Sequence, residues 1–323
     1  MSDFPMSGGY QAGLSKKRIR SLAGCIPENS PPFIVKKEKD QYIYDIDGNK
    51  YADFSLHSGS VICGHNFKTI TRFVKNGISA GTSPGFVDKF RHPLVKLFRT
   101  FCYFDNISFY ESAAGAFAAL AASAGSKTIG VTSSWLFENI AKAIPGIKVE
   151  RAQPDSEYGI LFFEPIDFDG DLGDFDYKKF SAVRKCAVES RTAFRLKSGF
   201  SNSLSDADFI LCGPVIANGI DSAVILSRLM LGGENIPSYK SIAILEAIKY
   251  YLRSGDLHKR EFKIDSGKIL FLRGSIFRTD LGGPAGSAEL LKRGVWLDGD
   301  TGYFCMQHTE NDIKRLERAL NGE

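Results

Sequence analysis

The middle of the chain alternates short apolar segments with helix-forming ones, and this alternation restricts the folds open to it. Helices are predicted from residue 113, where Ser112 can cap an alanine-rich run, at about 177–187, and at 238–253. Strands are predicted at four segments, of which the last three are continuous apolar runs: 127–131, 159–163, 208–212 and 223–227. Such runs are typical of strands buried on both faces. The pattern therefore predicts an α/β layer with a largely parallel sheet.

The two ends of the chain follow another pattern. The turn at 45–49 lies between two short strands, with Gly48 where a positive φ is needed, and helices are predicted at 66–78 and 87–101. After residue 250 the sequence predicts an antiparallel pair, a helix, two short strands and a last helix, at 268–274, 275–280, 287–293, 295–298, 303–306 and 311–320. This order is typical of a small α+β module, so we expect a domain boundary near residue 250.

Composition excludes several classes of protein. Among 323 residues, 41 are basic and 37 acidic, and the short basic clusters at 16–20 and 258–263 are interpreted as solvated helix faces, so no nucleic-acid partner is expected. No apolar run approaches the ~20 residues that span a bilayer, and the first residues lack a signal-peptide layout. Six cysteines without paired spacing and five histidines without a ligand pattern predict reduced thiols and no metal site. We therefore expect a cytoplasmic protein that does not contact membranes.

Several collinear segments resemble one enzyme family. They are PPFIVKKEKDQYIYDIDGNKYADF at 31–54, SGSVICGHN at 58–66, GTSPG at 81–85, FEPIDFDG at 163–170, DFILCGPVIANGI at 208–220 and the stretch 290–320. Together they resemble class III aminotransferases, and within that class most nearly glutamate-1-semialdehyde 2,1-aminomutase. The resemblance implies the fold-type-I architecture of pyridoxal-phosphate enzymes. It divides the chain into an N-terminal segment, 1–49, that contributes to the small domain, a large α/β domain at 50–250, and a small α+β domain at 251–323.

The resemblance also implies a lysine that forms an imine with the cofactor and a carboxylate beneath its pyridine nitrogen. The segment 208–220 places Pro214 at the lysine position, and proline has no primary amine. The flanking lysines are Lys197 and Lys240. The segment 186–195 places Val188 at the carboxylate position, with Glu189 next to it on the opposite face of the strand. A local shift of the alignment is the alternative in both segments.

The phosphate and ring contacts of the family are retained only in part. Ser112, Ala113 and Ala114 stand where the family binds phosphate at a helix N-terminus, but Glu111 adds a negative charge there. Trp135 falls near the aromatic residue that stacks on the pyridine ring. Where the family's partner subunit supplies a hydroxyl group, this chain has Met230 or Leu231, and Ser58 replaces an aromatic residue that contacts the substrate.

These departures predict a degenerate member of the family without catalytic residues, a pseudoenzyme that acts as a binding or partner subunit. The expected partner is a second copy of the chain or an intact homologue, with a small-molecule ligand as a further possibility. No cofactor is expected, unless pyridoxal or pyridoxamine phosphate binds noncovalently. The alternative is an active aminotransferase or aminomutase that uses a non-standard site, for example with Lys197 as the amine.

Overall fold

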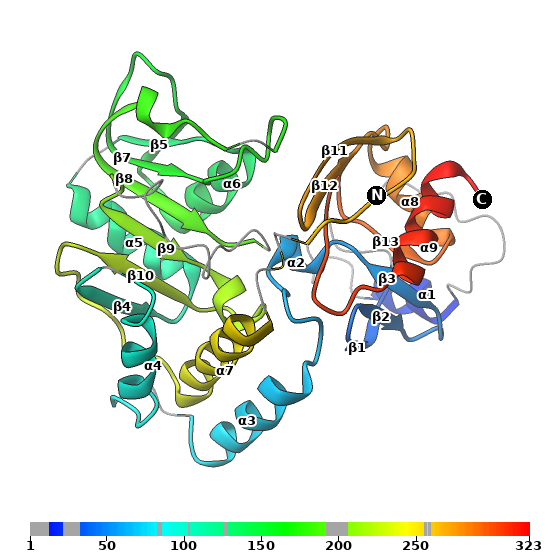
Figure 1. Ribbon diagram of the computed structural model, residues 1–323, viewed down its shortest axis with the longest axis horizontal. Coiled ribbons are helices and arrows are strands. Elements are labelled where there is room, and N and C mark those ends of the chain that lie inside the picture. The colour runs from blue at the N-terminus through cyan, green and yellow to red at the C-terminus, as the bar shows by residue number, and fades with distance from the viewer. Residues whose placement is uncertain are drawn as a thin grey trace.

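The computed structural model describes residues 13–21, 33–82, 86–102, 104–125, 128–172, 174–191, 206–254, 257 and 260–323. They form two lobes, which lie side by side in Figure 1. One lobe holds a seven-stranded sheet, and the other holds two smaller sheets. None of the described helices combines the length and the apolar composition that crossing a membrane requires.

The seven-stranded sheet has the order β4-β10-β9-β8-β7-β5-β6. The strands from β9 to β6 are parallel, whereas β10 runs antiparallel to both β9 and β4. The strands are β4 (Asn106–Tyr110), β5 (Thr128–Val131), β6 (Lys148–Arg151), β7 (Glu157–Phe163), β8 (Ser181–Glu189), β9 (Phe209–Cys212) and β10 (Ala223–Ser227). The predicted α/β layer with a mostly parallel sheet is therefore confirmed.

Helices cover both faces of this sheet because its strands present apolar side chains to both sides. In β7, Phe162 packs in the cluster that includes α5 and α6, whereas Leu161 and Phe163 pack in the cluster that includes α3, α4 and α7. The helices are α3 (Lys68–Ser79), α4 (Arg91–Phe98), α5 (Ala113–Ala124), α6 (Ser134–Ala143) and α7 (Ser238–Ser254). All but α6 were predicted from the sequence, and Ser112 caps α5 by accepting from the amide of Gly115.

The helix predicted at about 177–187 is wrong. A single 3₁₀ turn, η1 (Tyr177–Lys179), is followed by the strand β8. β8 pairs with β7 on one side and β9 on the other, and its second half is buried. Two strand neighbours satisfy its backbone groups and bury its apolar side chains, which outweighs local helix propensity. The strands β4 and β6 were also not predicted.

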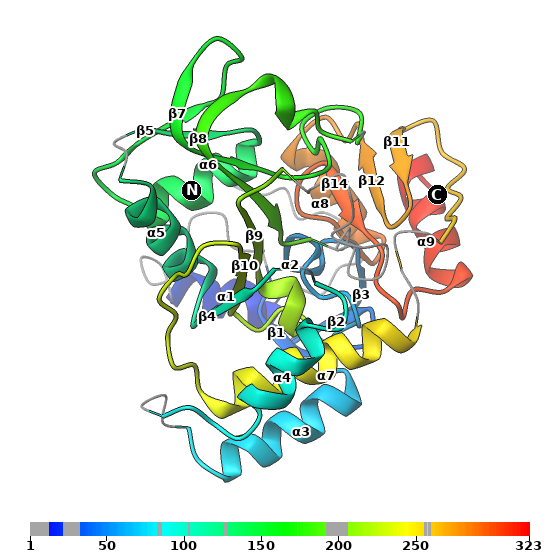
Figure 2. The same cartoon turned by 60° about the vertical axis from the view of Figure 1, so that its left-hand side comes forward.

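The second lobe joins both ends of the chain. β13 (Val295–Trp296) pairs in parallel with β3 (Lys50–Asp53), which forms a hairpin with β2 (Tyr42–Asp45) around Gly48 at φ 92°. Figure 2 shows the three-stranded sheet of this lobe beside the last two helices of the chain. The remaining elements are α1 (Gly13–Ser21), β1 (Val35–Lys39), β11 (Ile269–Arg273), β12 (Ile276–Thr279), α8 (Pro284–Lys292), β14 (Thr301–Tyr303) and α9 (Glu310–Asn321). The hairpin, the antiparallel pair β11–β12 and the last helix were predicted. The domain boundary near residue 250 stays a prediction, and α7 runs across that position.

Candidate functional site

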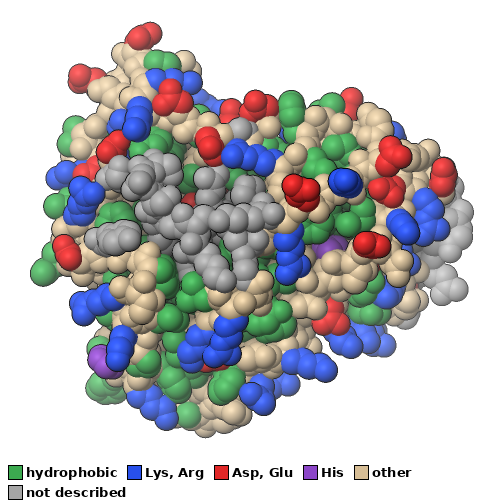
Figure 3. All heavy atoms as spheres, in the orientation of Figure 1, with side chains coloured by type: hydrophobic (Ala, Val, Ile, Leu, Met, Phe, Trp, Pro, Cys, Tyr) green, Lys and Arg blue, Asp and Glu red, His purple; other side chains and the backbone are tan. Residues whose placement is uncertain are grey.

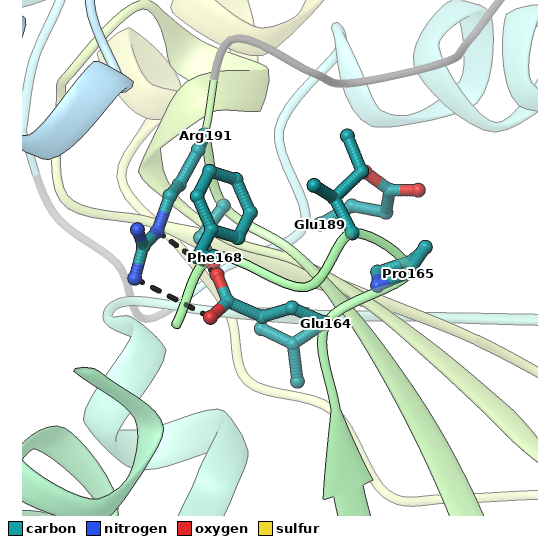
Figure 4. A pocket seen from close by; sticks show the side chains of 8 residues that line it. Glu164, Pro165, Phe168, Glu189 and Arg191 are labelled. Atoms are coloured by element: carbon teal, nitrogen blue, oxygen red, sulfur yellow. Dashed lines mark hydrogen bonds and ion pairs between the residues drawn. The ribbon is translucent and has the colours of Figure 1, made fainter. Parts of the chain in front are cut away.

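An ion pair is buried at the carboxyl ends of two neighbouring parallel strands. Glu164 follows β7 and Arg191 lies two residues after β8. Arg191 Nε lies 2.9 Å from Glu164 Oε1, and Arg191 Nη2 donates to Glu164 Oε2 at 3.3 Å (Figure 4). The side chains are only 7% and 2% exposed, so each charge depends on the other for compensation.

Further groups from both lobes hold this pair. Ser133, the residue before α6, donates its hydroxyl to Glu164 at 2.5 Å, and Arg191 donates to the Tyr303 hydroxyl on β14 at 2.9 Å. Burial raises the pKa of the Glu164 carboxyl, and Arg191 and Ser133 oppose that rise. Burial alone lowers the pKa of Arg191, but the charge of Glu164 together with Tyr303 and Asp169 outweighs it, so the pKa is raised and the guanidinium stays charged.

The Arg191 guanidinium also lies over two aromatic rings. Its central carbon is 4.0 Å from the ring centroid of Phe168 and 4.9 Å from that of Trp135. Cations over aromatic faces at this range are attracted by the ring quadrupole. Sequence reasoning identified Trp135 but missed Arg191. The signal in the sequence was an arginine just after the buried segment that forms β8, and a glutamate just after β7, the strand beside it in the sheet.

A cavity of about 350 Å³ opens between the lobes beside this pair, and we call it the cleft. Its walls include the three aromatic side chains named above and four carboxylates, Glu138, Asp169, Asp298 and Asp300. Burial, with a smaller effect from the charge of Asp53, raises the pKa of the Asp298 carboxyl. Within the described part of the chain, no group of three or more His, Cys, Asp and Glu residues is placed to hold a metal ion.

One turn of backbone at the cleft has a left-handed conformation. In the short helix α2 (Leu56–Gly59), the φ angles of Leu56, His57 and Ser58 are 46°, 53° and 54°. Ser58 lines the cleft, and a Cβ on Gly59 would lie 2.6 Å from the ring of Tyr303. Non-glycine residues rarely adopt this conformation, and such strain is found most often at functional sites.

Pro214 begins the 3₁₀ helix η3 (Pro214–Ala217) directly after β9. Its carbonyl accepts from the amide of Gly219 at 2.9 Å. The preceding Gly213 packs so closely on Ser190 that an added Cβ would meet Ser190 Oγ at 2.4 Å. The structure thus places Pro214 near the end of β8, although its equivalence to the family's lysine stays a prediction. Lys197 lies outside the described residues.

Val188 and Glu189 lie on opposite faces of β8. Val188 is 1% exposed and packs in the apolar cluster that Trp135 borders. Glu189 points away from the Glu164–Arg191 pair in Figure 4, toward the other face, where its charge is the second cause after burial of the raised pKa of the Cys212 thiol. Neither Val188 nor Glu189 therefore places a carboxylate on the face of β8 where Trp135 lies.

The N-terminus of α5 holds the other predicted contacts. Ala113 donates its amide to Asp221 at 3.3 Å, and Glu111 donates its amide to the Glu234 carboxylate at 2.8 Å. Lys240, which flanks the predicted lysine segment, donates its ammonium to the carbonyl of Glu111 at 2.6 Å. Ala114 is exposed. The structure thus brings Ser112, Ala113 and Ala114 together at one helix end, and Trp135 at the start of another helix, α6.

Comparison with known proteins gives sequence matches over part of the chain and fold matches over nearly all of it. Over 84 residues, 26% of this chain, it is 42% identical to glutamate-1-semialdehyde 2,1-aminomutase of Campylobacter hominis. The same enzyme of Thermodesulfovibrio yellowstonii is 34% identical over 82 residues. In both cases the match spans about a fifth, 19%, of the relative's length. No protein-family model matches the chain.

Solved structures match nearly the whole chain. A β-phenylalanine aminotransferase from Variovorax paradoxus superposes with a TM-score of 0.73 at 16% identity, covering 96% of this chain and 94% of its own. An ornithine aminotransferase from Toxoplasma gondii gives 0.72 at 14% identity, covering 95% and 94%. The resemblance to class III aminotransferases and the fold-type-I architecture of pyridoxal-phosphate enzymes are therefore confirmed.

Proposed function

We propose that this chain, built on the fold of a pyridoxal-phosphate-dependent aminotransferase, is a non-catalytic relative of glutamate-1-semialdehyde aminomutase that acts as a binding or partner subunit. The observation that carries the proposal is Pro214, which follows β9 at the position where the resemblance requires a lysine. An imine to the cofactor needs a primary amine, and proline provides none.

The nearby cations do not replace the lysine. Arg191 is held charged by Glu164, and a protonated guanidinium is not a nucleophile. Lys240 is bonded to the Glu111 carbonyl at the N-terminus of α5, rather than at the end of β9. The described residues therefore do not fit a covalently held pyridoxal phosphate.

The pyridine nitrogen would also lack its carboxylate. With Val188 in an apolar cluster and Glu189 on the other face of β8, this described strand supplies no acid that would keep that nitrogen protonated, and without one the ring would lose its use as an electron sink. We derive no reaction step through the cofactor in this chain.

A partner subunit is the second part of the proposal, and the surface beside β4 supports it. Three large apolar side chains are strongly exposed: Phe86 (80%), Val87 (69%) and Met230 (88%). Two contacts place their segments beside β4. Arg91, shortly after Val87, lies over the Phe109 ring, and Ser108 donates to the carbonyl of Leu231, next to Met230. Large exposed apolar side chains that gather in one region mark interaction surfaces. Over the face drawn in Figure 3, basic and acidic side chains are interspersed.

A cytoplasmic location is also part of the proposal, and rests on cysteines without paired spacing.

The test of lost catalysis is an absorbance scan of the purified protein with pyridoxal phosphate, followed by borohydride reduction and peptide mapping. We expect no stable aldimine band and no modified lysine. A band that reduction fixes on one lysine would overturn the proposal, and Lys197→Ala would show whether the alternative enzyme uses that residue.

The test of the partner role is the mass of the protein in solution, alone and mixed with an intact glutamate-1-semialdehyde aminomutase. We expect a homodimer or a mixed dimer, and Met230→Lys should weaken either. The matched control is Val183→Lys, at a 74% exposed position on β8. A monomer under both conditions would contradict this part.

A further inference from the structure

Three amides at and just before the N-terminus of α5 donate to oxygen atoms of this chain. The amides of Glu111, Ala113 and Gly115 donate to Glu234 (2.8 Å), Asp221 (3.3 Å) and Ser112 (3.0 Å) respectively. Two of these three acceptors are carboxylates. A helix N-terminus attracts negative charge through such free amides, and here the chain itself supplies that charge.

Hydrogen bonds hold the backbone around the exposed Glu234 beside β4 and the N-terminus of α5. Glu234 donates its amide to the Phe109 carbonyl on β4 at 2.7 Å, and Ser108 donates its hydroxyl to the Leu231 carbonyl at 2.9 Å. These bonds fasten the segment after β10 along β4. The carboxylate then lies over Gly115, where an added Cβ would be 3.5 Å from Glu234 Oε1.

The other end of the predicted cofactor site is filled as well. The Arg191 guanidinium lies against Trp135 and Phe168 and is bound to Glu164 behind them. A cofactor ring stacked on this side of Trp135 would have to move the guanidinium away from a buried carboxylate. Separating a buried ion pair is strongly unfavourable.

We infer that this chain replaces the cofactor with its own side chains, carboxylates at the phosphate end and Arg191 at the ring end, and so excludes pyridoxal phosphate even as a noncovalent ligand. The inference deepens the proposed function and rests on it for the position of the site. It takes the charged side chains at the two ends, and not a lack of open volume beside Arg191, as the cause of the exclusion.

The experiment compares the wild type with the double variant Glu234→Gln, Asp221→Asn, by thermal shift and by titration with inorganic phosphate and with pyridoxal phosphate. The side-chain oxygens of the new glutamine and asparagine can still accept the hydrogen bonds from the backbone amides, while two negative charges are removed. We expect neither compound to raise the melting temperature of the wild type. The double variant should bind inorganic phosphate about tenfold more tightly, equivalent to about 1.4 kcal/mol, because two charges that repel the anion are removed.

The double variant should bind pyridoxal phosphate no better than inorganic phosphate, because Arg191 still fills the ring end. The control Glu310→Gln, Glu317→Gln removes two charges from α9 in the other lobe and should bind neither compound. Stabilisation of the wild type by pyridoxal phosphate, no gain in the double variant, or an equal gain in the control would each overturn the inference. Wild-type binding that borohydride cannot fix would overturn this inference alone, whereas a fixed lysine would overturn the proposed function.

Discussion

Each lobe buries one carboxylate at the end of a strand, and the chain compensates the two differently. Glu164 ends β7 of the large sheet and is 2% exposed; Asp53 ends β3 of the small sheet and is 1% exposed. Glu164 is paired with Arg191, whereas Asp53 contacts His65 Nε2 at 2.7 Å. Arginine stays charged at any physiological pH, but histidine titrates near neutrality. Glu164 therefore has a partner whose charge is permanent, whereas the charge of the partner of Asp53 depends on pH.

The two carboxylates also differ in their other donors. Asp53 Oδ1 accepts from the amides of Ser55 at 2.8 Å and Leu56 at 3.1 Å. Among the described residues, Glu164 has only the Ser133 hydroxyl besides Arg191. These backbone amides remain when a side chain is replaced. Asp53 should therefore tolerate the loss of His65 better than Glu164 tolerates the loss of Arg191.

The largest effect should come from Arg191→Met. It leaves Glu164 buried without its cation, which costs about 3–5 kcal/mol in the free energy of unfolding. Chemical denaturation measures the loss, and the double variant Arg191→Met, Glu164→Gln should recover most of it because the unpaired charge is gone. A loss below about 1 kcal/mol, the range of exposed ion pairs, would show that the pair does not lock the lobe.

A smaller effect is expected from His65→Gln, about 1–3 kcal/mol, because Asp53 keeps its two amide donors. The same denaturation experiment applies. Glu38→Gln is the control, since its carboxylate is 37% exposed and lies 3.5 Å from His65 Nδ1, so its loss should stay within about 0.5 kcal/mol. If His65→Gln costs as much as Arg191→Met, the backbone donors do not protect Asp53 and the contrast between the lobes fails.

The smallest effect is a pH slope in the wild type. Burial lowers the pKa of His65, but the bond to Asp53 and the charges of Asp53 and Glu38 outweigh it and raise the pKa above its usual 6.5. This stabilisation is complete below pH 6.5 and is lost as the pH rises through the folded-state pKa. Stability should therefore fall with rising pH above 6.5.

The His65→Gln variant should lack this slope, and denaturation at a series of pH values above 6.5 compares the two proteins. The measurements stay above pH 6.5 because below that pH the titration of His308 makes stability change in the opposite direction. Burial lowers the pKa of His308 to about 4, so its contribution is lost as the pH falls from 6.5. An unchanged slope in His65→Gln would assign the pH dependence to another group.

Local sequence patterns predicted the elements that are specified by residues close together in the chain. The Ser112 cap of α5, the Gly48 hairpin and the last helix were all found from short-range signals. Strand β8 was not, because its conformation depends on pairing with β7 and β9, which are distant in sequence. Local propensity cannot report such neighbours.

The candidate site divides in the same way. Pro214, Val188 and Trp135 were identified from the order of residues, since a resemblance reads position along the chain. Arg191 and Glu234 were missed as parts of the site. Their roles depend on contacts with Glu164 and with the amide of Glu111, which are 27 and 123 residues away in the chain.

The sequence by itself determined the kind of fold and the presence of a proline at residue 214, because strand order, apolar runs and the identity of a side chain are written in the chain. Only the tertiary structure decided which charged side chains lie close together at the ends of the strands. Charges that are distant in sequence compensate one another only when strands such as β7 and β8 bring them within a few ångströms and bury them away from water.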